Sequence, residues 1–182
     1  MSEPTAPDAA PSPAAAPAAV PAPAPAPDPA LLALREEVGR LLGAAAAPDP
    51  ASGVPAWRID AAGILDAARR LRAAGFDYLL FVTAVDRPAE ARFEMVYLLT
   101  RYDDGRQLAL LADIPRETPE IDTVSGIWAG ADWHERETYD MFGIVFRGHP
   151  FLRRILLDED WPGYPLRKDY VDTLHDVVKR PY

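Results

Sequence analysis

The stretch FDYLLFVTAVDRPAEARFEMVYLLTRYDDGRQLALLA, residues 76–112, decides the fold of this chain. Three runs of aromatic and aliphatic residues lie within it, at residues 76–85, 93–101 and 107–112, and turn-forming residues separate them. Runs of this composition bounded by Asp, Pro and Gly are typical of β-strands. We therefore predict three strands, and the turn at residues 103–105 favours a hairpin between the last two.

The residues before this stretch predict two helices and a further strand. Leucine and valine recur at helical spacing over residues 31–42, and Gly43 follows as a stop. Residues 57–59 are expected to form a short strand, after which Asp60 can cap a helix that ends at Gly75. The order is therefore helix, strand, helix and three strands, followed by a helical region from about Thr123.

These elements predict an α+β fold: a small, mostly antiparallel four-stranded sheet with flanking helices and a long irregular C-terminal arm. The chain has 182 residues, which suits one domain of moderate size with an appended tail. We expect residues 1–30 to be a disordered Ala/Pro-rich leader and residues 31–130 to be the α+β domain. Residues 131–182 are expected to hold a charged helix and an extended, partner-binding C-terminal arm.

Charge and composition exclude several partners and cofactors. The net charge of −9 and the pI near 4.8 disfavour nucleic acid or an anionic membrane surface as the main partner, since phosphate binding needs a basic stripe. The chain has no cysteine, so it offers no disulfide, no thiolate ligand for zinc or an iron–sulfur cluster, and no cysteine nucleophile. Any such cofactor would belong to another chain.

The leader has proline at nearly every second position from Pro21 to Pro29, and its first basic residue comes only at Arg35. Repeated prolines remove backbone donors and favour an extended tail, whereas a signal peptide would need basic residues and an unbroken apolar core. No apolar run reaches the roughly 18 to 20 residues that span a bilayer. We therefore expect any membrane association to be indirect.

A helix is predicted over residues 132–142, with Asp132 and Glu135 as a capping-box-like pair and Gly143 as its end. At 100° per residue, apolar and charged residues share both faces of this helix. Its charges are therefore expected to be partly desolvated, and desolvated charges need partners.

Partners for these charges can be named from spacing. Arg136 and Asp140 can pair at i,i+4. The basic doublets at residues 153–154 and 167–168 are candidates for the other carboxylates. The alternative is a surface ion network that contributes little to stability.

Neither a metal site nor a catalytic pair is expected on this helix. His134, Glu137 and His149 are a minimal ligand set, but the sequence His-Glu-Arg-Glu-Thr places an arginine among the ligands. Glu135 and Glu137 could do acid–base work, yet two residues apart on a helix they point about 200° away from each other. An enzyme acting alone is disfavoured, and both histidines are interpreted as hydrogen-bonding or interface residues.

The segment of residues 143–170 contains prolines and glycines that interrupt both helix and sheet. It also carries a row of large apolar residues, namely Phe146, Phe151, Leu152, Ile155, Leu156, Leu157, Trp161, Tyr164 and Leu166. An irregular arm rich in Trp, Tyr and Arg is typical of an interface hot spot. The alternative is a lid packed on the domain's own sheet.

Over this region the chain resembles the 30 kDa subunit of respiratory complex I, which in bacteria is the C subunit of NADH-quinone oxidoreductase. The matching residues, which are expected at a subunit interface, are Glu135, Arg136, Glu137, Asp140, Gly143, Phe146, His149, Pro150, Leu152, Arg153, Arg154, Ile155, Leu156, Asp160, Trp161, Gly163, Pro165, Leu166, Arg167, Lys168, Asp169 and Tyr170. So many fixed spacings in one run make the match specific. Residues 31–130 carry little signature of their own, and the leader lies outside the resemblance.

The resemblance implies a cofactor-free, non-catalytic structural subunit of the hydrophilic arm of proton-translocating NADH:quinone oxidoreductase. In the assembled complex, electrons pass from NADH through FMN and Fe–S clusters to a quinone. The implied partners are the quinone-site subunit of the 49 kDa type and neighbouring iron–sulfur subunits. The implied location is peripheral, at the cytoplasmic face of the bacterial cell membrane.

On this basis we hypothesise that the charges of the helix and the two basic doublets form ionic and hydrogen-bonded contacts that hold the arm on its partner. Two alternatives stay open. One is the equivalent subunit of a related membrane-bound hydrogenase or another quinone-reducing dehydrogenase. The other is a free-standing soluble enzyme that uses the carboxylates of the helix.

Overall fold

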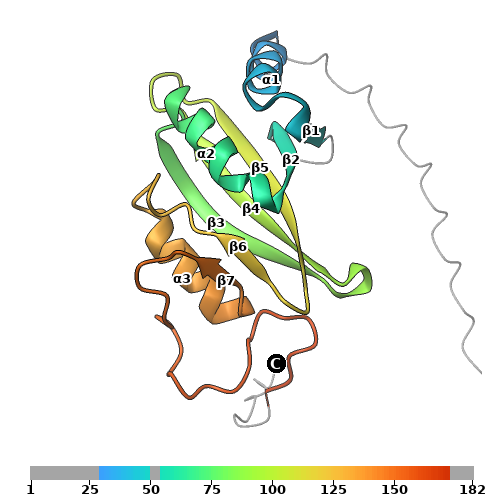
Figure 1. The fold of residues 1–182 in the computed structure, drawn as a ribbon, viewed down its shortest axis with the longest axis vertical. Coiled ribbons are helices and arrows are strands. Elements are labelled where there is room, and N and C mark those ends of the chain that lie inside the picture. The colour runs from blue at the N-terminus through green and yellow to red at the C-terminus, as the bar shows by residue number, and fades with distance from the viewer. Residues whose placement is uncertain (1–28, 50–53, 173–182) are drawn as a thin grey trace, which may run out of the picture.

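The computed structural model describes residues 29–49 and 54–172, and every structural statement below concerns these residues. The leader predicted for residues 1–30 lies outside them except for Pro29 and Ala30, which begin the first helix. The main elements in chain order are α1 (Pro29–Leu42), β1 (Ala46–Asp49), β2 (Ala56–Asp60), α2 (Ile64–Ala73), β3 (Tyr78–Arg87), β4 (Arg92–Thr100), β5 (Gln107–Pro115), β6 (Glu120–Asp122), α3 (Ala131–Phe142) and β7 (Val145–Arg147) (Figure 1).

The predicted α+β fold with a mostly antiparallel sheet is confirmed, but the main sheet has five strands where four were expected. Their order is β1-β2-β5-β4-β3, and every neighbouring pair is antiparallel except β2 with β5. The additional strand, β1, has the sequence AAPD, which shows no apolar alternation. A second sheet joins β6 to β7 in parallel, and neither of these three-residue strands was predicted.

Alternation along β4 shows why the sheet has one packed face. Phe93, Met95, Tyr97 and Leu99 are buried in the main core, whereas Glu94 and its alternate neighbours point to the opposite face. The predicted hairpin between the last two strands is confirmed as β4 and β5. The packed face therefore sets the register of the sheet.

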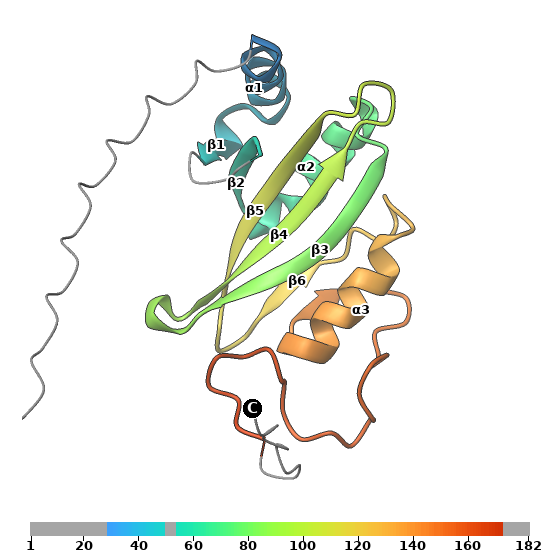
Figure 2. The same ribbon diagram turned by 180° about the vertical axis from the view of Figure 1, so that it is seen from behind.

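All three helices contribute to the same core. Leu34 and Val38 of α1, Leu71 of α2 and Phe142 of α3 are buried with the apolar residues of the packed face. Figure 1 shows α2 over this face, and Figure 2 shows β3, β4 and β5 uncovered on the other side. The sheet thus has a helix-covered face and an open face.

On the open face, one ionic network joins all five strands. Arg58 of β2 contacts Asp49 of β1 at 3.0 Å, Asp113 of β5 at 2.7 Å and Glu94 of β4 at 2.6 Å. Arg87 of β3 contacts the other oxygen of Glu94 at 3.3 Å. The network follows the strand order across the whole sheet.

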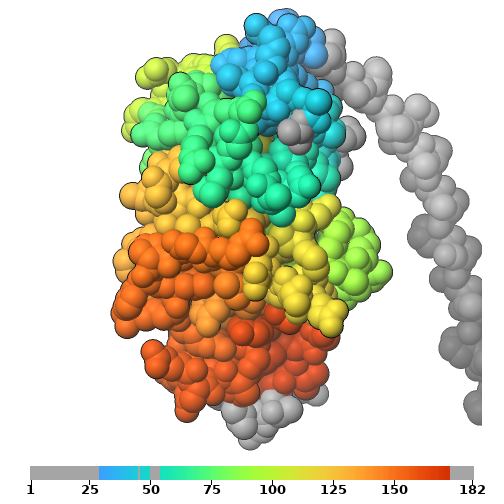
Figure 3. Space-filling view, viewed as in Figure 1, coloured from blue at the N-terminus to red at the C-terminus, as the bar shows by residue number. Residues whose placement is uncertain are grey.

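After β7, residues 148–172 contain neither helix nor strand, and we call this segment the arm. It runs around the C-terminal end of α3 and forms one end of the molecule (Figures 1 and 3). The irregular C-terminal arm was therefore predicted correctly. Within the described ranges, no helix has both the length and the apolar character needed to cross a bilayer.

Candidate functional site

The candidate site is α3 together with the arm, because the residues that carry the resemblance lie here. Gly143 ends α3 with φ of 73°, as its place in the sequence predicted, and its N–H donates to the carbonyl of Tyr139 at 2.8 Å. A Cβ at this position would lie 2.5 Å from the ring of Tyr164. After Gly143 the chain turns back along α3, and the space beside Gly143 admits its hydrogen atom but not a methyl group.

Asp140 is the first point that fixes the arm. Its fully buried carboxylate accepts hydrogen bonds from three consecutive backbone N–H groups, those of Ile155 at 3.0 Å, Leu156 at 2.8 Å and Leu157 at 3.1 Å. Arg154 donates to its other oxygen at 2.9 Å. Burial acts to raise the pKa of Asp140, but these donors outweigh it and lower the pKa below its usual value.

The predicted pairing of Arg136 with Asp140 is wrong. Spacing allowed it, but the carboxylate of Asp140 is already surrounded by Arg154 and the backbone of the arm. Arg154 also donates to the carbonyls of Trp161 at 3.2 Å and Gly163 at 3.1 Å. One arginine therefore joins α3 to two separate parts of the arm.

Asp86, at the end of β3, is the second fixed point, and the sequence had indicated only a turn there. Its buried carboxylate accepts two hydrogen bonds from Arg116, at 2.8 and 3.1 Å, and one from the backbone N–H of Lys168 at 2.8 Å. Hydrogen bonding to Arg116 holds the pKa of Asp86 below its usual value. Arg116 also contacts Asp169 at 2.6 Å. In the sequence, the only indication that Asp86 binds the arm was its place as an acid at the end of an apolar strand.

Arg167 provides the third fixed point. Its Nε donates to the carbonyl of Phe142 at 2.7 Å, and the N–H of Leu166 donates to the carbonyl of Met141 at 3.1 Å. These bonds satisfy carbonyls that the end of a helix leaves unpaired. The structure thus uses Asp140, Arg154 and Arg167 within the chain, while their contact with a partner stays a prediction.

Glu135 lies in a separate buried cluster. Its carboxylate accepts hydrogen bonds from the N–H of Val124 at 2.7 Å and from the hydroxyl of Thr123. The predicted capping box is therefore wrong: α3 begins one residue earlier, after Gly130, and Glu135 bonds to the preceding loop instead of to Asp132. The sequence predicted a helical region from about Thr123, but the helix begins only at Ala131, and nothing in the sequence linked Thr123 or Val124 to Glu135.

Burial raises the pKa of Glu135 to about 7, although the bonds from Thr123 and Val124 act to lower it. His149 Nε2 lies 3.8 Å from this carboxylate and 3.0 Å from Asp132 Oδ1. Nδ1 of His149 accepts the N–H of Phe151 at 3.0 Å, which places the proton of a neutral imidazole on Nε2. His149 is a hydrogen-bonding residue, as interpreted from the sequence.

The other predicted site residues lie around these clusters. Glu137 is exposed, and Arg136 is buried between two aromatic rings. Trp161 donates to the hydroxyl of Tyr170 at 3.1 Å, and Gly163 takes φ of 79° beside the ring of Tyr170. The remaining positions follow the surface of the arm: Pro150, Arg153, Asp160, Pro165, Lys168 and Asp169.

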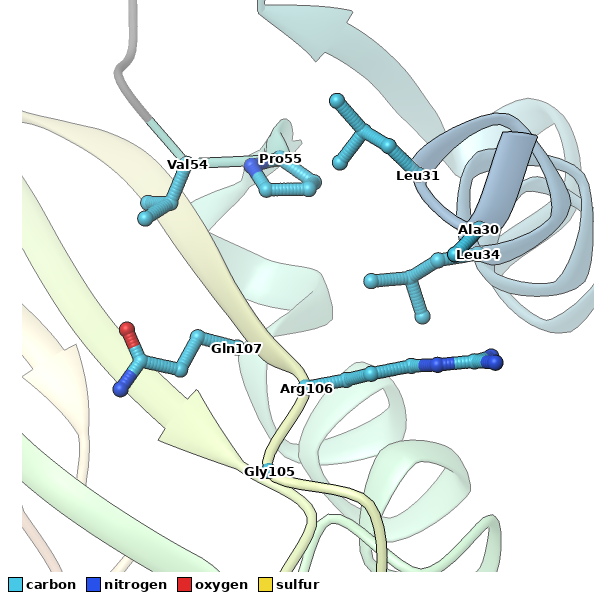
Figure 4. Close-up of a pocket in the computed structure, with 8 residues that line it drawn as sticks. All are labelled: Ala30, Leu31, Leu34, Val54, Pro55, Gly105, Arg106 and Gln107. Carbon is cyan, nitrogen blue, oxygen red and sulfur yellow. The ribbon is translucent and has the colours of Figure 1, made fainter. Parts of the chain in front are cut away.

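Two hollows lined by residues of the described ranges differ in their polar side chains. A pocket of ≈ 280 Å³ lies where α1 faces the start of β2, lined mainly by Leu31, Leu34, Val54 and Pro55, without a carboxylate or histidine (Figure 4). A larger one of ≈ 640 Å³ borders Asp132 and Arg147, but Glu135 does not line it. Among the residues from 29 to 49 and from 54 to 172, no three His or acidic side chains are grouped as metal ligands.

The fold and the site define a class of protein: an α+β domain whose irregular C-terminal arm is fixed to it by buried carboxylates and arginines. The family model "Respiratory-chain NADH dehydrogenase, 30 Kd subunit" matches residues 57–175. The chain belongs to this family.

Relatives and solved structures agree with this membership. The C subunit of NADH-quinone oxidoreductase from Roseiflexus sp. (strain RS-1) is 42% identical over 135 residues, which cover 69% of this chain and 78% of the relative. The protein of the same name from Chloroherpeton thalassium (strain ATCC 35110 / GB-78) is 46% identical over 109 residues, which are 59% of this chain and 45% of that longer protein.

Two solved structures share the fold. One is a chain of the membrane-bound sulfane sulfur reductase, an archaeal respiratory membrane complex, with a TM-score of 0.68 and 29% identity over 78% of this chain and 87% of that chain. The other is a trypsin-resistant fragment of Nqo5, with a TM-score of 0.59 and 28% identity over 65% of this chain and 98% of the fragment.

Proposed function

We propose that this chain is a cofactor-free, non-catalytic structural subunit of the hydrophilic arm of a proton-translocating NADH:quinone oxidoreductase. Membership of the 30 Kd subunit family supports assembly with other subunits. In this proposal electrons pass through other chains, from NADH through FMN and Fe–S clusters to quinone. This chain binds the quinone-site subunit of the 49 kDa type and neighbouring iron–sulfur subunits, peripherally at the cytoplasmic face of the bacterial membrane.

The observation that carries the proposal is an arm that is ordered by its own chain while it exposes apolar side chains. Phe151, Leu156, Leu166 and Val171 are between 51% and 74% exposed, although Asp140 and Asp86 hold the backbone of the arm and the carbonyl of Phe142 holds the side chain of Arg167. Several large apolar side chains exposed along one segment favour a binding surface. A surface that is ordered before association also loses less conformational entropy when it binds.

The side chains available as metal ligands support the proposal that the cofactors are bound by other subunits. Iron–sulfur clusters are held by cysteine thiolates, and the sequence contains none. The fully buried Glu135 bonds to Thr123 and Val124, whereas Glu137 is exposed and lines a hollow that Glu135 does not reach, which supports a structural role for Glu135. The free-standing enzyme therefore has less support than a subunit.

The likeness to the sulfane sulfur reductase chain supports a second candidate, the equivalent subunit of a related respiratory membrane complex. Both candidates share the arm and the fold, so the residues of this chain do not separate them. They differ in the electron donor, which other subunits would bind.

Purification through a C-terminal tag on this chain tests the proposal. We expect mild detergent extracts of the host membrane to yield flavin and iron–sulfur subunits together with NADH:quinone activity, identified by mass spectrometry and by assay of the eluate. The same tag on an unrelated soluble protein is the control. Hydrogenase or sulfur reductase subunits would favour the second candidate, and a chain recovered alone would contradict both.

A further inference from the structure

Arg136 of α3 is an almost fully buried cation, with 6% of its surface exposed. Its guanidinium carbon lies 5.0 Å from the centroid of the Trp133 ring and 5.5 Å from that of Phe151. Nε is buried without a hydrogen-bond partner, and in the described part of the chain no carboxylate forms an ion pair with Arg136. Ring stacking attracts the charge but leaves the Nε–H donor unsatisfied.

Other arginines with little exposure are paired with carboxylates within the chain, although Nε of Arg101 likewise lacks a hydrogen-bond partner. Each of the most enclosed ones meets a carboxylate: Arg154 meets Asp140, Arg116 meets Asp86, and Arg101 meets Glu37. Burial of a cation costs several kcal/mol unless it is paired, so these pairs follow the usual rule. Arg136 does not follow this rule, and it is one of the residues that carry the resemblance to the family.

The side chains around Arg136 form a surface patch. Trp133 is 62% exposed and Phe151 is 54% exposed. The guanidinium of Arg153, itself exposed, stacks at 4.2 Å on the Phe151 ring. We name these four residues, Trp133, Arg136, Phe151 and Arg153, the Arg136 patch. It combines two cations with two exposed aromatic rings, the residue types that dominate binding hot spots.

The carboxylates closest in sequence are engaged elsewhere or face another side. Asp140 bonds to Arg154, Glu135 bonds to the loop before α3, and Asp132 lies beside His149. Glu137 lines a hollow between α3 and β3 together with His134. A chain with a net charge of −9 therefore presents two arginines here that no acid within residues 29–49 and 54–172 neutralises.

We propose that the Arg136 patch binds an aspartate or glutamate side chain of a partner subunit. A carboxylate accepts two hydrogen bonds from a guanidinium in its plane, while the rings of Trp133 and Phe151 exclude water around the pair. A single carboxylate suits the patch better than a polyanion, because the rest of the chain is strongly acidic. This inference rests on the proposed function, since it requires an assembled partner.

Replacement of the charge tests the patch in the full-length tagged chain. We expect Arg136→Met to keep the unfolding midpoint of the purified chain at or above that of the wild type, because methionine packs between the rings without an unpaired charge. Recovery of partner subunits should fall by roughly tenfold or more. The matched control is Arg72→Met, an exposed arginine on α2, which should leave recovery unchanged.

Carbodiimide coupling of an Arg136→Lys variant identifies the bound group. An amide between Lys at position 136 and an aspartate or glutamate of another subunit, found by mass spectrometry of the purified complex, supports the proposal. Coupling only to acids of this chain, or unchanged recovery with Arg136→Met, would overturn it while leaving the proposed function in place. A wild-type chain recovered without any partner would overturn both.

Discussion

Gly143 combines a backbone conformation and a tight space that alanine fits poorly. Its φ is 73°, and an added Cβ would lie 2.5 Å from Tyr164 and 2.9 Å from Arg167. Gly148 shares the positive φ, at 79°, but a Cβ there would meet only Thr123 at 3.6 Å. Comparison of alanine variants at the two glycines therefore distinguishes the cost of backbone strain from the cost of steric overlap.

We expect Gly148→Ala to lower the free energy of unfolding by about 1 to 2 kcal/mol, which is the cost of the left-handed conformation. Gly143→Ala should cost about 1 to 3 kcal/mol more, because Tyr164 and Arg167 must move. Urea denaturation of both variants measures the difference. Equal losses would show that the ring of Tyr164 moves aside without cost.

Glu135 gives the stability of the protein a pH dependence of unusual sign. Its pKa is raised by burial from 4.5 to about 7, so the folded state binds an additional proton between these pH values. The groups that face it are Thr123, Val124, Asp132 and His149. Stability from this group is complete below pH 4.5 and is lost as the pH rises through about 7.

We expect the free energy of unfolding of the wild type, measured relative to Glu135→Gln, to fall by on the order of 3 kcal/mol between pH 4.5 and 7.5. Glutamine keeps the shape and one acceptor but does not titrate. Denaturation at several pH values, with Glu137→Gln as the exposed control, measures this difference. A constant difference would contradict the raised pKa.

Predictions for single residues were correct where the local backbone alone determines the conformation. The stop at Gly143 depends on the local backbone and was predicted correctly. The capping role of Glu135 and the pairing of Arg136 with Asp140 were wrong, because residues far along the chain compete for the same carboxylates. The hydroxyl of Thr123 bonds to Glu135 and the backbone at residues 155–157 bonds to Asp140, so neither carboxylate takes its predicted partner.

At the scale of elements, the arm depends on few contacts, and Asp140 makes the greatest number of them. We expect Asp140→Asn to weaken the attachment of the arm by about 3 to 5 kcal/mol, because the amide faces Arg154 with a donor and leaves that cation unpaired. Trypsin should then cut after residues 153, 154, 167 and 168 at least tenfold faster, roughly the effect of 1.4 kcal/mol.

The control for this change is Asp160→Asn, an exposed carboxyl in the same arm. Mass spectrometry of timed digests gives the cleavage rates, and circular dichroism shows whether the α+β domain stays folded. Because the pKa of Asp140 is lowered, its contribution is present above pH 3.8 and is lost as the pH falls below that value. Unchanged cleavage would show that Asp86 and Phe142 hold the arm without it.

The elements themselves were predictable in proportion to their length. The strands β3, β4 and β5 have nine or ten residues each, with enough apolar residues to be found from composition. β1, β6 and β7 have three or four residues each; β6 and β7 pair with each other although they are distant in the sequence, and β1 pairs with the next strand, β2. Such pairing is a tertiary property, so local patterns did not reveal it.

For the molecule as a whole, the ionic network of the open face crosses every strand of the main sheet. Glu94 lies at its centre and accepts from Arg58, Arg87 and Arg92, while Asp49 and Asp113 complete it. Burial acts to raise the pKa of Glu94, but the three arginines outweigh it and lower the pKa below 4.5. Its contribution is therefore present above pH 4.5 and is lost as the pH falls.

We expect Glu94→Gln to lower the free energy of unfolding of the whole domain by about 2 to 4 kcal/mol at pH 7, because three clustered guanidinium groups lose their shared anion. The denaturation midpoint should shift with an unchanged slope, since the sheet unfolds as one unit. A double-mutant cycle with Arg58→Met isolates the pair at 2.6 Å. An unchanged denaturation midpoint together with faster cleavage of the arm would contradict this prediction. That result would mean that Glu94 stabilises the arm and not the sheet.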